Sequence, residues 1–204
     1  LVVDHQAVAP FWGFTTSPLM HGNLLLVQTG GSKGNAISAF RPTSGDLVWS
    51  AGSDTVDYQS PRVFRFGDRE HLVFHGNHYL FGLVPETGEI LWEFEHGGQS
   101  GASSTSGYPV EVGEGRFFVK NRGNGGLLIQ VQADNETYGV EEVWKTRNIR
   151  STYIYAVHHD GQLFGYRGRI LTCLDAESGE RIWQSREPGD GLPIVVDGHL
   201  VVIT

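Results

Sequence analysis

A few short stretches carry residue types that could do chemistry. His158-His159-Asp160 offers two imidazoles and a carboxylate, which are groups that bind zinc. Adjacent residues of a strand point to opposite faces, so the two histidines do not easily share one ion. We interpret the sequence HDG as a hairpin turn, and we expect another surface hairpin at HGNH, between His75 and His78. No metal site is predicted.

Other reactive groups are sparse. The segment Gly30–Asn35, GGSKGN, has a lysine among glycines but lacks the spacing of a phosphate-binding loop, so we interpret it as a turn. Cys173 is the only cysteine, and it lies in the apolar run RILTCLDA. It cannot form a disulfide within the chain, and we expect it to be buried. We predict no catalytic residue, which favours a protein without catalytic activity but does not decide the matter.

Composition limits the class of protein. The chain has 204 residues, a net charge of -8, 39% hydrophobic residues and 19% charged residues, as in a folded globular protein. The acidic balance argues against nucleic acid as a partner, because duplex binding requires a basic face. No apolar run approaches the ~18 residues of a membrane span, and no signal peptide opens the sequence. A start at Leu1 and an apolar final run lead us to expect a fragment of a longer protein.

An internal repeat organises the chain. Tryptophans recur every 39 to 52 residues, a spacing that fits one four-stranded blade of a β-propeller. Before each one, short apolar runs alternate with Gly, Asn and Asp, as in LLLVQTG, HLVFHG and QLFGYRG. Such runs predict strands, and no segment predicts a helix. The 28 glycines agree with a chain of many turns.

The most regular part of the repeat is a turn followed by a tryptophan strand. It reads PTSGDLVW, PETGEILW and AESGERIW, and the glycine of each is expected to have positive φ in a hairpin turn with a bulge. The hydroxyl before that glycine can bond to nearby backbone, and the tryptophan is expected to wedge between neighbouring sheets. The residues given this structural role are Gly45, Trp49, Gly88, Trp92, Trp144, Gly179 and Trp183.

The third repeat departs from this pattern. The sequence VQADNETYGVEEVW, Val131–Trp144, is longer than its counterparts. Tyr138-Gly139 stands where the compact turn stands in the others, and we expect a lengthened loop here.

These motifs resemble the PQQ-like, or quinoprotein-type, β-propeller repeat, whose signature is an A-x-D-x-x-T-G-x-x-x-W run in each blade. The resemblance extends from Phe11 to the end of the chain, and the stretch FWGFTTSPLMHGN is similar to BamB-like bacterial cell-envelope proteins. It implies an all-β fold of four-stranded antiparallel blades, about four of them, from a ring of seven or eight. Residues 1–204 would form the repeat region, with approximate blades at 11–55, 56–99, 100–149 and 150–191 and the start of another at 192–204.

The resemblance also implies where a binding surface would lie. Aligning HGN with HDG places Thr15 and Tyr153 in register, and the first strand of a blade lines the central channel in this family. Aromatic and arginine side chains there would suit contact with a partner, whereas ordinary packing between first strands is the alternative. The expected channel-rim residues are Trp12, Phe14, Tyr58, Tyr108, Arg150 and Tyr153.

Two functions follow from the resemblance. The first is a non-catalytic binding scaffold of the bacterial cell envelope, periplasmic or otherwise extracytoplasmic, that holds a protein partner or small ligand at the channel face without a cofactor. The second is a quinone-dependent dehydrogenase with PQQ and calcium in the funnel. Those enzymes have two adjacent cysteines beside the cofactor, and this chain has only Cys173. A sensor domain attached to a signalling protein is a third, less favoured reading.

Overall fold

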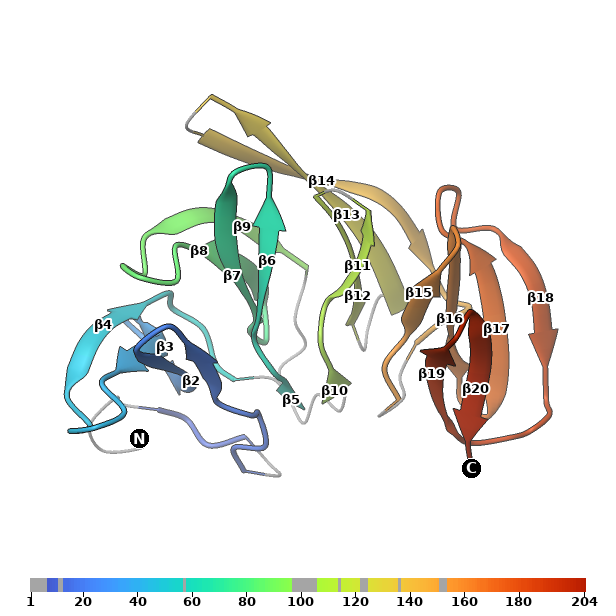
Figure 1. The fold of residues 1–204 in the computed structure, drawn as a ribbon, viewed down its shortest axis with the longest axis horizontal. Helices are drawn as coiled ribbons and strands as arrows, with labels where there is room; N and C mark the ends of the chain where they lie inside the picture. Colours follow the sequence, from blue (N-terminus) through green and yellow to red (C-terminus); the bar gives the residue numbers. More distant parts are fainter. Residues whose placement is uncertain are drawn as a thin grey trace. The chain divides into compact units, whose positions relative to one another are not determined.

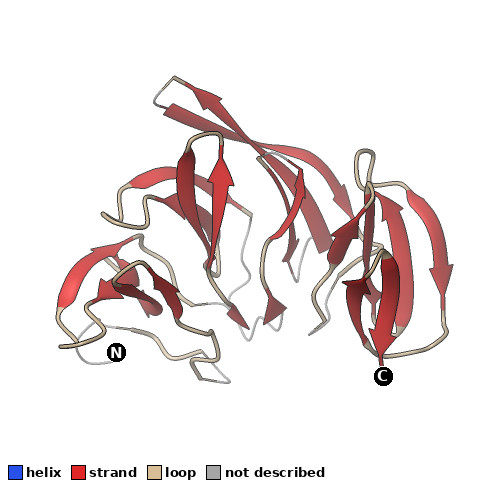
Figure 2. Cartoon of the chain, in the orientation of Figure 1, coloured by secondary structure: helices blue, strands red, loops and turns tan. Residues whose placement is uncertain are grey.

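The computed structural model describes residues 7–10, 13–56, 58–96, 106–113, 115–121, 125–135, 137–150 and 154–204. Throughout these ranges the regular secondary structure is β-strand and no helix occurs (Figures 1 and 2). The described residues therefore contain no helix that could cross a membrane. The predicted all-β class is confirmed.

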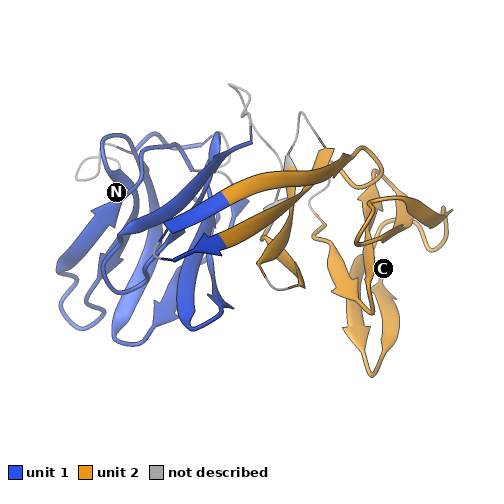
Figure 3. Cartoon of the chain, turned by 90° about the horizontal axis from the view of Figure 1, so that it is seen from above, with its two compact units in different colours: residues 1–103, 133–139 blue, residues 104–132, 140–204 orange. Residues whose placement is uncertain are grey.

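The chain divides into two compact units, which Figure 3 shows in different colours. Unit 1 comprises residues 1–103 and 133–139. It holds two four-stranded antiparallel sheets, each with its strands in chain order, and a two-residue strand between them. The strands are β1 (Leu19–His21), β2 (Leu24–Gly31), β3 (Asn35–Phe40), β4 (Leu47–Ala51), β5 (Tyr58–Gln59), β6 (Arg62–Phe66), β7 (Arg69–His75), β8 (Tyr79–Leu83) and β9 (Ile90–Glu95).

Unit 2 comprises residues 104–132 and 140–204. It holds two more four-stranded sheets in chain order and a final two-stranded hairpin. The strands are β10 (Ser106–Gly107), β11 (Val110–Gly113), β12 (Arg116–Asn121), β13 (Gly125–Asp134), β14 (Thr137–Thr146), β15 (Val157–His159), β16 (Gln162–Arg167), β17 (Ile170–Asp175), β18 (Arg181–Ser185), β19 (Leu192–Val196) and β20 (His199–Ile203). The four described four-stranded sheets are the predicted blades.

The hydrophobic core of each unit lies between neighbouring sheets. In unit 1 one cluster joins Leu26 and Ile37 of the first sheet to Phe74 and Leu83 of the second. A corresponding cluster in unit 2 joins residues of the β11–β14 sheet to residues of the β15–β18 sheet. Because the two middle strands of a sheet are covered on both faces, their sequences are nearly continuous apolar runs rather than alternating ones.

The compact turns before the tryptophans share one geometry. In the β8–β9 turn Val84 and Glu89 close the hairpin, and the N–H of Gly88 donates to the Val84 carbonyl at 2.9 Å. Thr87 Oγ1 accepts from the N–H of Glu89 at 3.3 Å. The register then shifts opposite Gly82 and Leu83, which is the predicted bulge. The predicted positive φ is confirmed for Gly45, Gly88 and Gly179, at 77°, 74° and 71°.

The third repeat forms a long hairpin and not the lengthened loop that we expected. Tyr138 and Gly139 are within β14, and the chain reverses between Asp134 and Thr137. Asn135 takes a positive φ of 54°, which asparagine adopts more easily than most residues, and Thr137 Oγ1 donates to the Asp134 carbonyl at 2.9 Å. Both strands thereby extend to ten residues, and the end of this hairpin, residues 133–139, belongs to unit 1 (Figure 3).

Candidate functional site

The tryptophan of the first sheet is fixed to the turn of the second. Trp49 Nε1 donates to the carbonyl oxygen of Pro85 at 3.2 Å, and the indole ring lies against Gly88. A Cβ atom on Gly88 would lie 2.4 Å from Trp49 Cε3, so this position requires glycine for space as well as for its φ. The bond places the β8–β9 turn, and with it Glu86, at a defined point beside the first sheet.

The same arrangement recurs in unit 2. Trp144 Nε1 donates to the carbonyl oxygen of Ala176 at 3.2 Å, and a Cβ on Gly179 would lie 2.6 Å from Trp144 Cδ2. Ala176 and Gly179 occupy the turn positions that Pro85 and Gly88 occupy in unit 1. The indole-to-turn contact is therefore the repeated device that joins one sheet to the next.

Trp92 uses a different acceptor. The third repeat has no compact turn, and Trp92 Nε1 instead donates to Nδ1 of His71 at 3.0 Å. The His71 ring is fully buried and makes edge contacts with Phe66 and with Tyr138, at 4.5 Å and 4.7 Å between ring centroids. Sequence reasoning missed His71; the missing turn after Trp92 was the available signal that another acceptor must exist.

The protonation state of His71 follows from its surroundings. Burial, followed by the nearby charge of Arg69, lowers the pKa of His71 from 6.5 to about 4. The imidazole is therefore neutral at pH 7. Since its Nδ1 accepts the indole hydrogen, its own hydrogen is on Nε2.

A second buried polar group, Asp54, holds the β7–β8 connection. Its side chain is 3% exposed. Oδ2 accepts from the backbone N–H groups of His78 and Tyr79 at 2.7 and 2.9 Å, and Oδ1 accepts from the N–H of Thr55 at 2.8 Å. A Cβ on Gly76 would lie 2.4 Å from Oδ2, so the backbone approaches this carboxylate very closely. The HGNH segment is therefore a hairpin tied to a buried acid, and sequence reasoning missed that acid.

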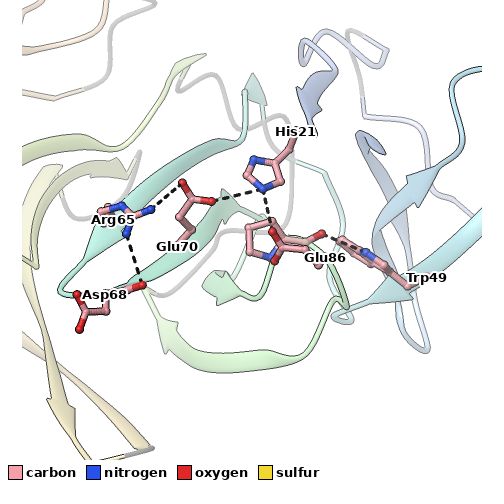
Figure 4. A network of polar contacts seen from close by, with 7 residues as sticks. His21, Trp49, Arg65, Asp68, Glu70 and Glu86 are labelled. Atoms are coloured by element: carbon pink, nitrogen blue, oxygen red, sulfur yellow. Dashed lines mark hydrogen bonds and ion pairs between the residues drawn. The ribbon is translucent and has the colours of Figure 1, made fainter. Parts of the chain in front are cut away.

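Among the described residues, one group of side chains is close enough to share a metal ion. It consists of His21, Glu70 and Glu86 (Figure 4). His21 is the last residue of β1, Glu70 is on β7, and Glu86 is in the β8–β9 turn. His21 Nε2 lies 3.1 Å from Glu86 Oε1 and 3.5 Å from Glu70 Oε2. All three ligand atoms lie within 4.8 Å of one another.

Neighbouring groups hold this cluster in place. Arg65 Nη2 lies 3.6 Å from Glu70 Oε1, the oxygen that does not face His21. Arg65 Nη1 also donates to the Asp68 carbonyl at 3.5 Å, which restrains the guanidinium (Figure 4). Sequence reasoning did not find the cluster, because its members come from two repeats and carry no local motif.

The predicted channel-rim residues are partly described. Trp12 and Tyr153 lie outside the described residues. Phe14 and Tyr58 are half-buried in unit 1, before β1 and in β5. In unit 2, Tyr108 is half-buried and stacks on Tyr155 with ring centroids 5.1 Å apart, and Arg150 donates its backbone N–H to the Tyr166 carbonyl at 3.0 Å. Their convergence on one rim stays a prediction.

The remaining chemical candidates take structural positions. Cys173 is buried, as predicted, and burial, followed by the charge of Asp175, raises the pKa of its thiol. His158 and His159 end β15 before the turn at Asp160, which confirms the predicted hairpin. The GGSKGN segment likewise turns between β2 and β3, with Lys33 at a φ of 58°.

Solved structures with the same fold come from several proteins. BamB from Moraxella catarrhalis is 15% identical, with a TM-score of 0.64 over 93% of this chain and 58% of that one. The computationally designed Ika8 protein is 9% identical, with a TM-score of 0.57 over 91% of this chain and 54% of that one. Quinohemoprotein alcohol dehydrogenase from Comamonas testosteroni is 12% identical, with a TM-score of 0.55 over 93% of this chain and 39% of that one.

These similarities establish the fold, and the chain spans less than two thirds of the length of each of these structures. A search of curated proteins gave no match. The family is established by sequence. The model of the family described as outer membrane protein assembly factor BamB matches residues 5–185, most of the chain, and the chain belongs to that family.

Proposed function

We propose that the chain is part of a non-catalytic β-propeller scaffold of the bacterial cell envelope that binds a protein partner during assembly of outer-membrane proteins. The observation that carries this proposal is the match of the BamB family model over residues 5–185. The process is taken from the name of that family, and the channel face expected from the family resemblance is the proposed binding surface.

The use of polar side chains in unit 1 supports a scaffold. His71 accepts the indole hydrogen of Trp92, and Asp54 accepts backbone hydrogens from the β7–β8 connection. Both groups are buried and hold one segment of the chain to another. A perturbed pKa marks a candidate active-site residue only when the group also faces a cleft; in ion-pair and hydrogen-bond networks it reflects structure. His71 is a buried member of such a network, so its lowered pKa reflects a structural role.

The proposed contact surface includes Tyr108 and Arg150 of unit 2. Tyr108 is half-buried and its ring is stacked on Tyr155, so it presents an aromatic surface that has already lost side-chain freedom. Tyrosine and arginine are the residue types that contribute most often to the binding energy of protein interfaces. A rigid aromatic pair loses little further entropy on binding. Trp12, Phe14, Tyr58 and Tyr153 stay candidate contact residues on the family resemblance alone.

The proposal is tested in a bacterium that carries the full-length gene. Cell fractionation should place the protein in the envelope, and its depletion should lower the amounts of outer-membrane β-barrel proteins measured by quantitative mass spectrometry. Replacing Tyr108 and Arg150 by alanine should reproduce the loss while the protein remains folded by circular dichroism. A cytoplasmic protein, or unchanged outer-membrane protein levels after depletion, would overturn the proposal.

Cofactor binding by the purified chain tests the quinone-dependent alternative. We propose that this chain does not bind PQQ tightly, because a flat anion with three carboxylates needs cationic or N–H donors in a closed pocket. The net charge of -8 opposes its approach at long range. Titration with PQQ and calcium, followed by absorbance, should give no saturation at micromolar concentration. Stoichiometric binding with dye-linked oxidation of alcohols or sugars would establish the dehydrogenase instead.

A further inference from the structure

The His21, Glu70 and Glu86 cluster of unit 1 brings two carboxylates to one imidazole. A neutral imidazole has a single N–H, and Nε2 of His21 faces an oxygen of each glutamate at once. One hydrogen cannot serve both oxygens along a straight line. The two carboxylates carry like charge, and their ligand atoms lie within 4.8 Å of each other. The arrangement therefore has an excess of acceptors over donors at its centre.

A metal ion resolves this excess with small movements. Nitrogen and oxygen ligands of a tetrahedral Zn²⁺ bind at about 2.0–2.2 Å, which places them roughly 3.3–3.6 Å from one another. The two observed separations from His21 Nε2, 3.1 and 3.5 Å, are close to this spacing. The remaining distance is the one between the ligand oxygens of Glu70 and Glu86, which is within 4.8 Å. Rotation of the Glu86 side chain can adjust it, because 60% of that side chain is accessible to solvent.

Two of the three ligands, Glu86 and Glu70, are held by groups that are not themselves ligands. The turn that carries Glu86 is fixed by the bond from Trp49 Nε1 to the Pro85 carbonyl. Arg65 lies beside the outer oxygen of Glu70 and leaves the inner oxygen directed at His21 (Figure 4). Such outer contacts orient ligands in known metal sites and contribute to affinity. The exposed side of Glu86 leaves room for a water molecule as a fourth ligand.

The equivalent turn of unit 2 gives an internal comparison. Glu177 follows Ala176 as Glu86 follows Pro85, and it too is reached by a side chain of the preceding sheet. There, however, Arg116 Nη1 donates to Glu177 Oε2 at 2.6 Å. A guanidinium satisfies the carboxylate directly and cannot bind a metal. In unit 1 the turn glutamate is met instead by an imidazole, from the end of β1, and that makes the turn different.

We propose that His21, Glu70 and Glu86 bind a divalent ion of the Zn²⁺ class, which ties the first sheet to the second. One imidazole and two carboxylates suit Zn²⁺, Co²⁺, Ni²⁺ and Cu²⁺, whereas Mg²⁺ and Ca²⁺ prefer sites made of oxygen alone. The ion joins β1 to β7 and to the β8–β9 turn, so its binding stabilises unit 1. This inference is independent of the proposed scaffold function.

Metal binding is measured on the purified full chain after treatment with a chelator. Calorimetric titration with Zn²⁺ should give one saturable site, and Co²⁺ should give the visible absorption of a tetrahedral complex. Zn²⁺ at 100-fold its Kd should raise the unfolding midpoint by roughly 5–10 °C. Mg²⁺ at the same concentration should leave the midpoint unchanged.

Two ligand variants and one matched control decide where the ion binds. His21→Gln and Glu86→Gln should each weaken Zn²⁺ binding at least about 10-fold, the loss that even outer-shell changes cause. Glu177→Gln alters the equivalent turn of unit 2 and should bind Zn²⁺ as the unaltered chain does. Should His21→Gln fail to fold, the exposed Glu86→Gln change decides the question. No saturable binding by the unaltered chain, or equal affinity in a folded ligand variant, would overturn the proposal.

Discussion

Trp92 donates its indole hydrogen to Nδ1 of His71 at 3.0 Å, within one sheet, whereas Trp49 and Trp144 donate to carbonyl oxygens of a neighbouring turn. The difference follows from the third repeat, in which β13 and β14 form a long hairpin in place of the compact turn. Tyr138 of that hairpin contacts the His71 ring. His71 therefore supplies the acceptor that the regular repeat obtains from the next blade.

Replacing His71 should reveal this dependence. His71→Leu leaves the buried indole hydrogen of Trp92 without its acceptor, which should lower the free energy of unfolding by about 1–3 kcal/mol. Trp92→Phe removes the donor, and in that background His71→Leu should cost less because no hydrogen is left unsatisfied. Urea unfolding of the four chains gives the coupling energy. Strictly additive effects of the two changes would show that the bond contributes nothing to stability.

Stability should also depend on pH through His71. The pKa of His71 is about 4 in the folded chain and 6.5 in the unfolded chain, so the unfolded chain binds the extra proton between these values. The free energy of unfolding should therefore be unaffected by this group above pH 6.5 and should fall as the pH is lowered from 6.5 towards 4. At pH 5 the loss is about 2 kcal/mol.

The His71→Leu chain is the control for this effect. Other groups titrate in both proteins, so the difference between their pH profiles isolates the imidazole. Chemical unfolding at intervals from pH 4.5 to 7.5 should show a profile that falls more steeply towards acid for the unaltered chain. Parallel profiles would mean that His71 titrates alike in the folded and unfolded states.

The fold could be predicted because its signals are local. Gly88, with the residues around it, specifies a turn within six positions, and Trp92 follows at a fixed spacing. The third repeat shows the limit of that reasoning, because the expected long loop is a hairpin of two ten-residue strands. Gly139 stands five residues before Trp144, whereas the turn glycines of the other repeats stand four before their tryptophans, and the chain reverses earlier, at Asn135, which accepts positive φ.

The polar sites could not be predicted because their members are far apart in sequence. His21 and Glu86 are 65 positions apart, and His71 meets Tyr138 from another repeat. Their contacts depend on which sheets are neighbours and on how long one hairpin is. Neither the order of neighbouring sheets nor the length of the hairpin can be read from the sequence next to these residues. The turn glycines gave no such difficulty, because each makes its turn within a few residues of chain.

A turn glycine can be required for its positive φ or for the space that its missing side chain leaves, and Gly45 and Gly88 distinguish these two reasons. Both have positive φ, but a Cβ on Gly45 meets nothing within 4 Å, whereas a Cβ on Gly88 would lie 2.4 Å from Trp49. Gly45→Ala should cost about 1–2 kcal/mol from backbone strain alone. Gly88→Ala adds displacement of a packed indole and should cost about 1–3 kcal/mol more. Equal losses in thermal or urea unfolding would mean that the ring moves aside freely.

A large loss of stability is expected at Asp54. Its carboxylate accepts backbone hydrogens from Thr55, His78 and Tyr79, and it is 3% exposed. Asp54→Ala leaves these donors without their acceptor and opens space in the core, which should lower the free energy of unfolding by about 3–5 kcal/mol. Asp54→Asn keeps the shape and one acceptor oxygen, so it should retain part of that stability.

Amide hydrogen exchange places the effect of Asp54 within the chain. The amides of His78 and Tyr79 donate directly to Oδ2, and their exchange should accelerate most in Asp54→Ala. Amides of β16 and β17, in unit 2, serve as the internal reference and should exchange as before under conditions where the chain stays folded. Unchanged protection at His78 and Tyr79 would contradict the role assigned to the carboxylate. If protection is lost only at the amides of His78 and Tyr79, Asp54 fixes the β7–β8 connection locally and does not control the fold of the whole unit.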